Sequence, residues 1–185
     1  MSDRERKTQR IAGYEPGGGS EAADEALAGV SKMFGGYIPN FHKVVATSPT
    51  AITAFAQMRQ TMQKTKIRAA EREIIALEVS RRNRCDYCLA AHKAEARMRR
   101  VPEDDIEAAA TGKPMQNPRH ALVQRATQML IDTRARLSDE QLEAFRSEGL
   151  SDGELIEIIA VIGWYVWSTF VNNLADTEVD PYWGD

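Results

Sequence analysis

Apolar residues recur at helical spacing along almost the whole chain, and this periodicity constrains the fold more than any other feature. Between residues 155 and 170, for example, large apolar side chains return every three or four positions, as they do on one face of an α-helix. The alternation of apolar and polar positions, rich in β-branched residues, that is typical of strands is absent from the sequence. The sequence therefore predicts an all-α fold.

Caps and helix breakers divide this pattern into short segments. Ser138 is followed three residues later by Gln141, and Ser151 by Glu154, which is the signature of a capping box at a helix start. Asn83 interrupts the periodic pattern between two apolar segments. We expect helices over residues 26–34, 41–46, 49–64, 85–99 and 119–136, one around 74–79, a short one between 102 and 112, and two beginning at 138 and 151.

The first 24 residues differ in composition from the rest of the chain. They contain Pro16 and three consecutive glycines among charged residues, a flexible composition that adds little to a core. We expect residues 1–24 to form a flexible tail and residues 25–185 to form a single all-helical domain. A chain of 185 residues buries roughly 70% of its unfolded surface. The core therefore needs no disulfide or structural metal, and the two cysteines are available for chemistry.

Charge and hydropathy exclude two classes of partner. The chain has 24 Lys and Arg against 27 Asp and Glu, and it has no long basic stretch that would bind nucleic acid. The first ten residues carry charges of both signs and lack the apolar run of a secretory signal. The apolar segment 156–174 includes Glu157, Ser168, Asn172 and Asn173, which favours a buried helix over a membrane span. We expect a cytoplasmic protein that binds neither nucleic acid nor a membrane.

The last helical segment is apolar most of the way round, since a second stripe through Trp164 and Trp167 accompanies the main apolar face. A helix of this kind is either central in the core or shared between subunits. We expect both to be partly true, and hence a homo-oligomer.

The two cysteines of the chain form a CxxC motif, Cys85 and Cys88, and His92 follows one helical turn later. At about 100° per residue the three side chains lie within roughly 60° of one another on a helix. The imidazole can then accept a proton from a thiol and leave the nucleophilic thiolate. If Asn83 caps this helix, Cys85 lies in its first turn, where the helix dipole favours the thiolate.

Other interpretations of the motif compete with redox chemistry. Free cysteines are often small buried apolar residues. Zinc is another alternative, since Cys85, Cys88 and His92 supply three ligands, but a closed site needs a fourth, and His42 and His120 lie in other segments. A disulfide requires a distorted first turn, because ideal helix geometry separates i and i+3 Cβ atoms by about 5–6 Å and a disulfide needs about 3.8 Å. In a cytoplasmic chain, CxxC on a helix is more often redox-active, and we expect no cofactor and no metal.

Glu73 lies twelve residues before the CxxC, and with this glutamate the motif resembles the carboxymuconolactone decarboxylase superfamily, specifically its alkyl hydroperoxidase D-like, peroxidase-related branch. The resemblance spans about residues 38–180. Its core is Glu73, Val79-Ser80, Asn83, Cys85, Cys88 and His92, of which the glutamate with the CxxCxxxH motif is the specific signal. Weaker matches are Ile38-Pro39-Asn40, Ser48-Pro49 and Asn172-Asn173. The resemblance implies an all-helical thiol peroxidase that assembles as trimers or hexamers.

The resemblance also implies roles for the four site residues. Cys88 would attack the hydroperoxide, Cys85 would resolve the sulfenic acid as a disulfide, and His92 with Glu73 would relay the proton. The dipole argument instead favours Cys85 as the more acidic thiol; we predict attack by Cys88 because His92 lies one turn from it. On one continuous helix Glu73 would lie about 18 Å from Cys85, so its role requires a bend, expected at Asn83.

The expected substrate is a hydroperoxide, and the expected electron donor is a dithiol or a disulfide reductase. Phe41, Phe55, Trp164 and Trp167 are apolar candidates for a pocket that favours organic hydroperoxides, although core packing explains them equally well. Two rival functions remain: a lyase that acts on a lactone acid, as in the superfamily's name, and a non-catalytic oligomeric protein whose thiols sense redox state.

Overall fold

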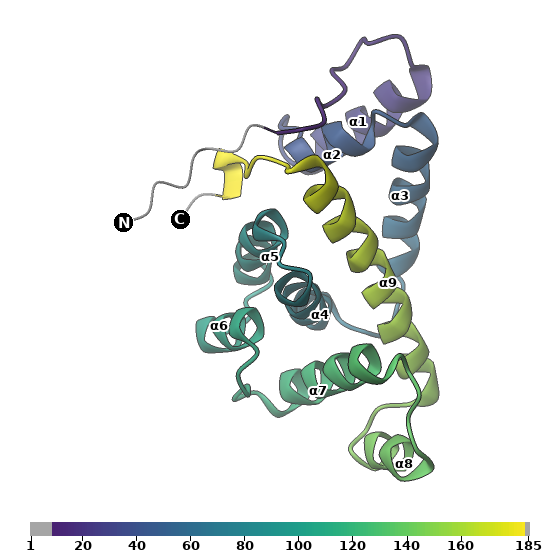
Figure 1. The fold of residues 1–185 in the computed structure, drawn as a ribbon, viewed down its shortest axis with the longest axis vertical. Helices are drawn as coiled ribbons and strands as arrows, with labels where there is room; N and C mark the ends of the chain where they lie inside the picture. Colours follow the sequence, from purple (N-terminus) through teal and green to yellow (C-terminus); the bar gives the residue numbers. More distant parts are fainter. Residues whose placement is uncertain (1–8, 184–185) are drawn as a thin grey trace. The chain divides into compact units, whose positions relative to one another are not determined.

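The structure, a computed structural model, describes residues 9–183 as α-helices joined by short connections (Figure 1). No strand occurs within this range, which confirms the all-α prediction. The helices are α1 (Glu21–Met33), α2 (Asn40–Val45), α3 (Pro49–Met62), α4 (Ala69–Arg82), α5 (Asp86–Met98), α6 (Glu103–Thr111), α7 (Pro118–Thr133), α8 (Asp139–Ser147) and α9 (Asp152–Ala175), followed by the 3-10 turn η1 (Pro181–Trp183).

The predicted capping residues are present. The hydroxyl of Ser138 accepts from the backbone N–H of Gln141 at 3.3 Å, and the Gln141 side chain accepts from the N–H of Ser138 at 2.9 Å. Ser151 and Glu154 make the same reciprocal pair at the start of α9. Gly112 ends α6 with φ of 77°, a left-handed conformation that glycine adopts without a steric penalty. These local signals explain why the expected bounds of most helices agree closely with those observed, whereas α1 and α4 each begin five residues earlier than expected.

Helix α1 begins four residues before the expected start of the folded body at residue 25. The Ser20 hydroxyl accepts from the N–H of Ala23 at 3.3 Å and caps the helix. The Tyr14 hydroxyl accepts from the N–H of Ser20 at 3.0 Å and donates to Asp24 at 3.1 Å. The described part of the expected tail is therefore hydrogen-bonded to α1. Residues 1–8 of that tail lie outside the described residues.

The chain divides into two compact units, and the prediction of one domain after residue 24 stays a prediction. The first unit comprises residues up to 61 together with those from 170 onward. In it, the carboxylate of Asp180 accepts from the Tyr37 hydroxyl at 2.5 Å and from the N–H of Asn40 at 3.0 Å. The ring of Phe34 packs edge-on against Trp183 with centroids 5.7 Å apart. These contacts hold the C-terminal segment to the start of α2.

The second unit, residues 62–169, is built on α4, against which α5, α6 and α7 all pack (Figure 1). Its core contains apolar side chains from these helices and the loops between them: Ile74, Leu77, Ala96, Val101, Ile106, Ala108, Ala109 and Met115. This packing fixes the two helices that carry the cysteines, His92 and Glu73.

Truncation of this core is expected to destabilise the protein strongly. Ile106 is fully buried in it, so Ile106→Ala should lower the free energy of unfolding by about 2–5 kcal/mol through lost burial and a residual cavity. Ile156 on α9 is 66% exposed, and Ile156→Ala serves as the matched control with a change within about 0.5 kcal/mol. Urea unfolding of both variants measures the difference. Equal effects of the two substitutions would contradict the assignment of the core.

Two buried carboxylates on α4 are paired with arginines. Glu71 is fully buried and accepts hydrogen bonds from Arg68 and from Arg119. Burial raises the pKa of Glu71, but the hydrogen bonds from Arg119 and Arg68 outweigh it and the net shift is downward. Glu78, also fully buried, pairs with Arg81 and Arg82. Removing one partner of such a pair leaves a buried charge uncompensated, so these contacts fix the position of α4.

Helix α9 is long and apolar enough to cross a membrane by length and composition, a test that core helices also pass, and 33% of its most apolar window is buried. Ile159 and Phe170 on its apolar face are 38% and 59% exposed. The buried positions of this helix include Ser168 and Thr169, whose hydroxyls donate to carbonyls of the helix itself. The predicted oligomer contact of this helix stays a prediction.

Candidate active site

The chain bends sharply between α4 and α5. Arg84 has φ of 52°, and the N–H of Cys85 donates to the carbonyl of Ser80 at 3.0 Å. Helix α5 then packs against α4 instead of continuing it. This is the bend that a shared role of Glu73 and His92 requires, and it lies at the predicted place.

Asn83 contributes to the bend in a different way from the one expected. It is the C-cap residue of α4, and its side-chain amide donates to the Thr169 hydroxyl at 2.7 Å. The prediction that Asn83 caps α5 is therefore wrong. Cys85 itself is the N-cap of that helix, two residues after Asn83.

The N-cap position brings the two cysteines together. Cys85 has extended backbone angles, φ −99° and ψ 98°, and its sulfur accepts from the backbone N–H of Cys88 at 3.4 Å. Both side chains are buried, with exposures of 1% and 3%. Since Cys85 is outside the regular helix, the pair is not held to the i, i+3 separation of an ideal helix.

The same geometry acidifies one thiol. A hydrogen bond from the Cys88 thiol is the main cause that lowers the pKa of Cys85. Burial opposes this shift, while the backbone N–H of Cys88 and the charge of His92 support it. A thiolate at a helix N-terminus also gains from the helix dipole. The structure thus stabilises negative charge on Cys85 and makes Cys88 the donor to it.

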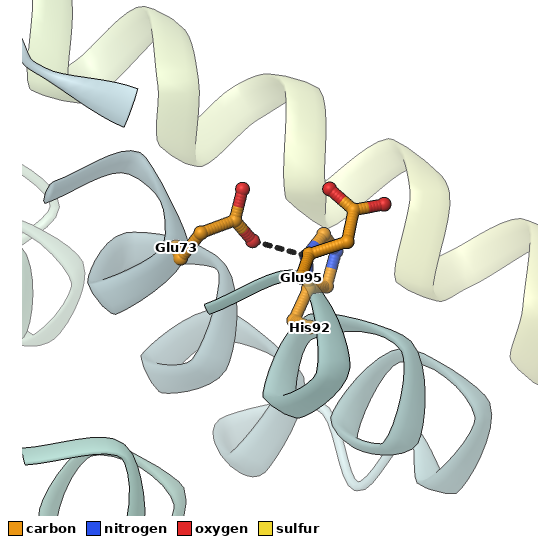
Figure 2. Close-up of side chains that lie close together, drawn as sticks. All are labelled: Glu73, His92 and Glu95. Atoms are coloured by element: carbon orange, nitrogen blue, oxygen red, sulfur yellow. Dashed lines mark hydrogen bonds and ion pairs between the residues drawn. The ribbon is translucent and has the colours of Figure 1, made fainter. Parts of the chain in front are cut away.

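Glu73 and His92 meet across the two helices. The Nδ1 atom of His92 lies 2.9 Å from a carboxylate oxygen of Glu73, as Figure 2 shows. Both side chains are largely buried, with exposures of 14% for His92 and 6% for Glu73. The imidazole also packs edge-on against the ring of Tyr165, with centroids 4.9 Å apart. The ring is therefore held in one orientation by a carboxylate on one side and an aromatic ring on another.

This environment favours the imidazolium. Burial lowers the pKa of His92, but the hydrogen bond to Glu73 and the negative charges of Glu73, Glu95 and Cys85 outweigh it, so the net pKa is raised. Glu95, one turn after His92 on α5, was not singled out from the sequence. The i, i+3 spacing of His92 and Glu95 was the available signal, because residues three apart on a helix are neighbours.

Comparisons with known proteins agree with this architecture. Residues 49–113 match the model of the carboxymuconolactone decarboxylase family. The structure is similar to an alkylhydroperoxidase AhpD core, an uncharacterized peroxidase-related protein from Ralstonia eutropha, with 20% identity, a TM-score of 0.83, and coverage of 96% of this chain and 95% of that one.

The match to the carboxymuconolactone decarboxylase family model covers about a third of this chain. The fold is that of the AhpD-like branch. A peroxidase-related protein from a Silicibacter species has 22% identity and a TM-score of 0.78 over 97% of both chains. The apo debrominase Bmp8 has 17% identity and a TM-score of 0.72 over 94% of both chains. No functionally curated protein matches significantly.

The other two histidines lie away from the cysteines. His120 is buried, and its Nδ1 atom lies 2.7 Å from the carboxylate of Asp105, which joins α6 to α7. His42 is buried in the first unit, where burial, and then the charge of Arg59, lower its pKa to about 3. Within residues 9–183, the cysteines take part in no group of three or more possible metal ligands.

The apolar pocket candidates divide between the two units. Phe41 and Phe55 pack on each other in the first unit, with ring centroids 5.0 Å apart. Trp164 stacks on Tyr165 in the second unit, at 4.7 Å, and so joins the aromatic group that contacts His92. Trp167 is half-buried on α9. Of these four candidates, Trp164 is the one that the contacts above connect to His92, through Tyr165.

Replacing Glu73 is expected to change the titration of His92. In Glu73→Gln the carboxylate charge is lost, so the pKa of His92 should fall and the imidazolium should lose its proton at a lower pH. An NMR titration of the imidazole C–H signals measures this shift. Glu143→Gln, on the exposed part of α8, is the control that should leave the titration unchanged. A His92 pKa that is equal in the native and Glu73→Gln proteins would contradict the coupling.

Proposed function

We propose that this protein is a thiol-dependent peroxidase that reduces hydroperoxides, preferentially organic ones, through a Cys85–Cys88 dithiol/disulfide cycle. The observation that carries the proposal is the juxtaposition, in one unit, of an acidified dithiol at the start of α5 with a Glu73–His92 pair. A nucleophilic sulfur, a second thiol to resolve its oxidised form, and an oriented acid are the parts that this reaction needs. The apolar wall of Tyr165 and Trp164 favours an organic substituent on the hydroperoxide.

The Cys88 thiol donates to Cys85 and lowers its pKa, which favours negative charge on Cys85. Transfer of that shared proton to Cys85 places the charge on Cys88, one helical turn from His92. A dithiol with one shared proton thus accounts for two properties that otherwise conflict: Cys85 is the more acidic thiol at rest, and Cys88 is the attacking sulfur.

The chemical steps balance without a bound cofactor. The Cys88 thiolate attacks the terminal oxygen of ROOH, the O–O bond breaks, and Cys88 sulfenic acid and an alkoxide form. The His92 imidazolium protonates the alkoxide to ROH, while the Glu73 carboxylate holds the ring in place. The Cys85 thiol then attacks the sulfenic sulfur and releases water. One hydroperoxide is reduced, and the two thiols are oxidised to one disulfide.

Turnover requires a second protein or small molecule that supplies two electrons. We infer a dithiol or disulfide-reductase donor in the cytoplasm, because thiol–disulfide exchange reduces strained disulfides readily. We also infer that the chain assembles as a homo-oligomer, a trimer or hexamer. The strongly exposed Phe170 and Leu174, one turn apart on α9, are the apolar surface that such an assembly would cover.

Stoichiometry and turnover together test the proposed function. The reduced protein should consume one equivalent of cumene hydroperoxide per chain and form a Cys85–Cys88 disulfide, detected by peptide mapping. With dithiothreitol or dihydrolipoamide present, consumption should continue through many cycles. Oxidation of the cysteines without repeated hydroperoxide consumption, with any of several dithiols, would overturn the proposal and favour a redox-sensing protein. Turnover of a lactone acid instead would favour the lyase.

A further inference from the structure

Glu73, His92 and Glu95 form a cluster of possible metal ligands. One carboxylate oxygen from each glutamate and one imidazole nitrogen all lie within 4.8 Å of one another. Figure 2 shows the three side chains gathered at one place, Glu73 from α4 and the other two from α5. The cluster is the one group of this kind among residues 9–183, and it was not expected from the sequence.

The donor set identifies the class of ion. One imidazole nitrogen and two carboxylate oxygens suit Zn²⁺ and similar divalent transition metals, which bind such atoms at about 2.0–2.2 Å. Ca²⁺ and Mg²⁺ take oxygen ligands instead, so the imidazole disfavours them. Tetrahedral coordination at that distance places ligand atoms about 3.4 Å apart. Rotations of the two flexible glutamate side chains bring atoms that now lie within 4.8 Å to that spacing.

We propose that Glu73, His92 and Glu95 bind a divalent transition-metal ion of the Zn²⁺ type, and that the bound ion blocks the His92 proton relay. The ion takes the place of the proton between Glu73 and His92. Two carboxylates neutralise its charge, and the fourth coordination position remains for water. The binding part stands on geometry alone, whereas the blocking part rests on the proposed peroxidase function.

The burial of the ligands supports selective binding. Glu73 and His92 lie on packed helices whose positions are fixed by the core, so the site loses little freedom when the ion binds. His92 and Glu95 are three residues apart on one helix and present their donors side by side. The ligand set leaves out both cysteines, which separates this site from a zinc site built on the CxxC motif.

Calorimetric titration with Zn²⁺ alone tests the binding part. The Cys85→Ser/Cys88→Ser variant removes the competing thiols and should still bind one ion per chain. Adding Glu95→Gln to it should weaken the affinity by at least about 10-fold, and adding the control Glu143→Gln should not change it. Loss of all Zn²⁺ binding with the thiols, or an unchanged affinity in the Glu95→Gln variant, would overturn the proposal.

Cobalt provides a measurement that does not depend on the double cysteine variant. Native protein loaded with Co²⁺ should show visible d–d bands without an intense near-ultraviolet thiolate-to-cobalt charge-transfer band. A strong charge-transfer band would instead show that the cysteines hold the metal, and the proposal would fail.

The blocking part is tested through activity. Zn²⁺ should inhibit hydroperoxide consumption by the native protein, a chelator should restore it, and Glu95→Gln should need at least about 10-fold more Zn²⁺ for the same inhibition. Binding without inhibition in an active enzyme would overturn the blocking part alone. Because the titration needs no turnover, failure of the proposed peroxidase function remains distinguishable from failure of the metal site.

Discussion

The Cys88→Ser variant is expected to lose hydroperoxide turnover entirely, by at least about 1000-fold in kcat/KM. A serine hydroxyl has no accessible anion at neutral pH, so the attacking group of the proposed cycle is absent. The substitution keeps the size of the side chain at a buried position, and the fold should persist. Steady-state consumption of cumene hydroperoxide with a dithiol donor measures the loss, and circular dichroism confirms the fold.

Cys85→Ser is the matched variant, because it removes the neighbouring thiol from the same turn. It should also lose multiple turnover, yet still consume one equivalent of hydroperoxide and stop at a Cys88 sulfenic acid, which dimedone traps. Mass spectrometry then assigns the modified residue. Sulfenic acid trapped on Cys85 of the Cys88→Ser variant, and none in Cys85→Ser, would reverse the order of attack. Such a result would assign the nucleophile to the thiol that the structure acidifies.

Local signals made most of the fold predictable from the sequence. The capping boxes at Ser138 and Ser151 and the glycine at 112 depend on neighbouring residues only, and the structure has them where expected. The burial of α9 was harder to predict. A hydropathy pattern ranks Phe170 above Ser168 for burial, whereas the helix buries the serine, whose hydroxyl is satisfied by its own backbone.

The candidate site was predictable as a set of residues but not as a network. The spacing of Cys85, Cys88 and His92 requires only a helix, and the resemblance to a family added Glu73. The N-cap of α5 is Cys85 and not Asn83. The spacing of residues in the sequence does not distinguish two candidate caps that lie so close together. Glu95 was missed because its relevance arises only when α4 brings a second carboxylate to the same imidazole.

His92→Ala is expected to lower kcat/KM for hydroperoxide reduction by about 100-fold or more at neutral pH. The imidazolium donates the proton to the departing alkoxide, and positioned general acids contribute about 10²–10⁴-fold. The raised pKa of His92 keeps this acid protonated at pH values where an ordinary histidine is neutral. The native rate should therefore fall as the pH rises through the raised pKa of His92, and the variant should lack that decline.

The pH profile distinguishes an acid from a merely structural ring. His120→Gln replaces another buried histidine, one that pairs with Asp105, and should keep the alkaline decline even if the protein becomes less stable. Glu73→Gln should keep the decline but move it to lower pH, because His92 loses the carboxylate that raises its pKa. An alkaline decline that persists unchanged in His92→Ala would assign it to another group, and His92 would then only position the thiols. If His92 is an imidazolium supported by the Glu73 carboxylate, the alkaline decline must both move to lower pH in Glu73→Gln and disappear in His92→Ala. Either change alone also arises from disturbed packing.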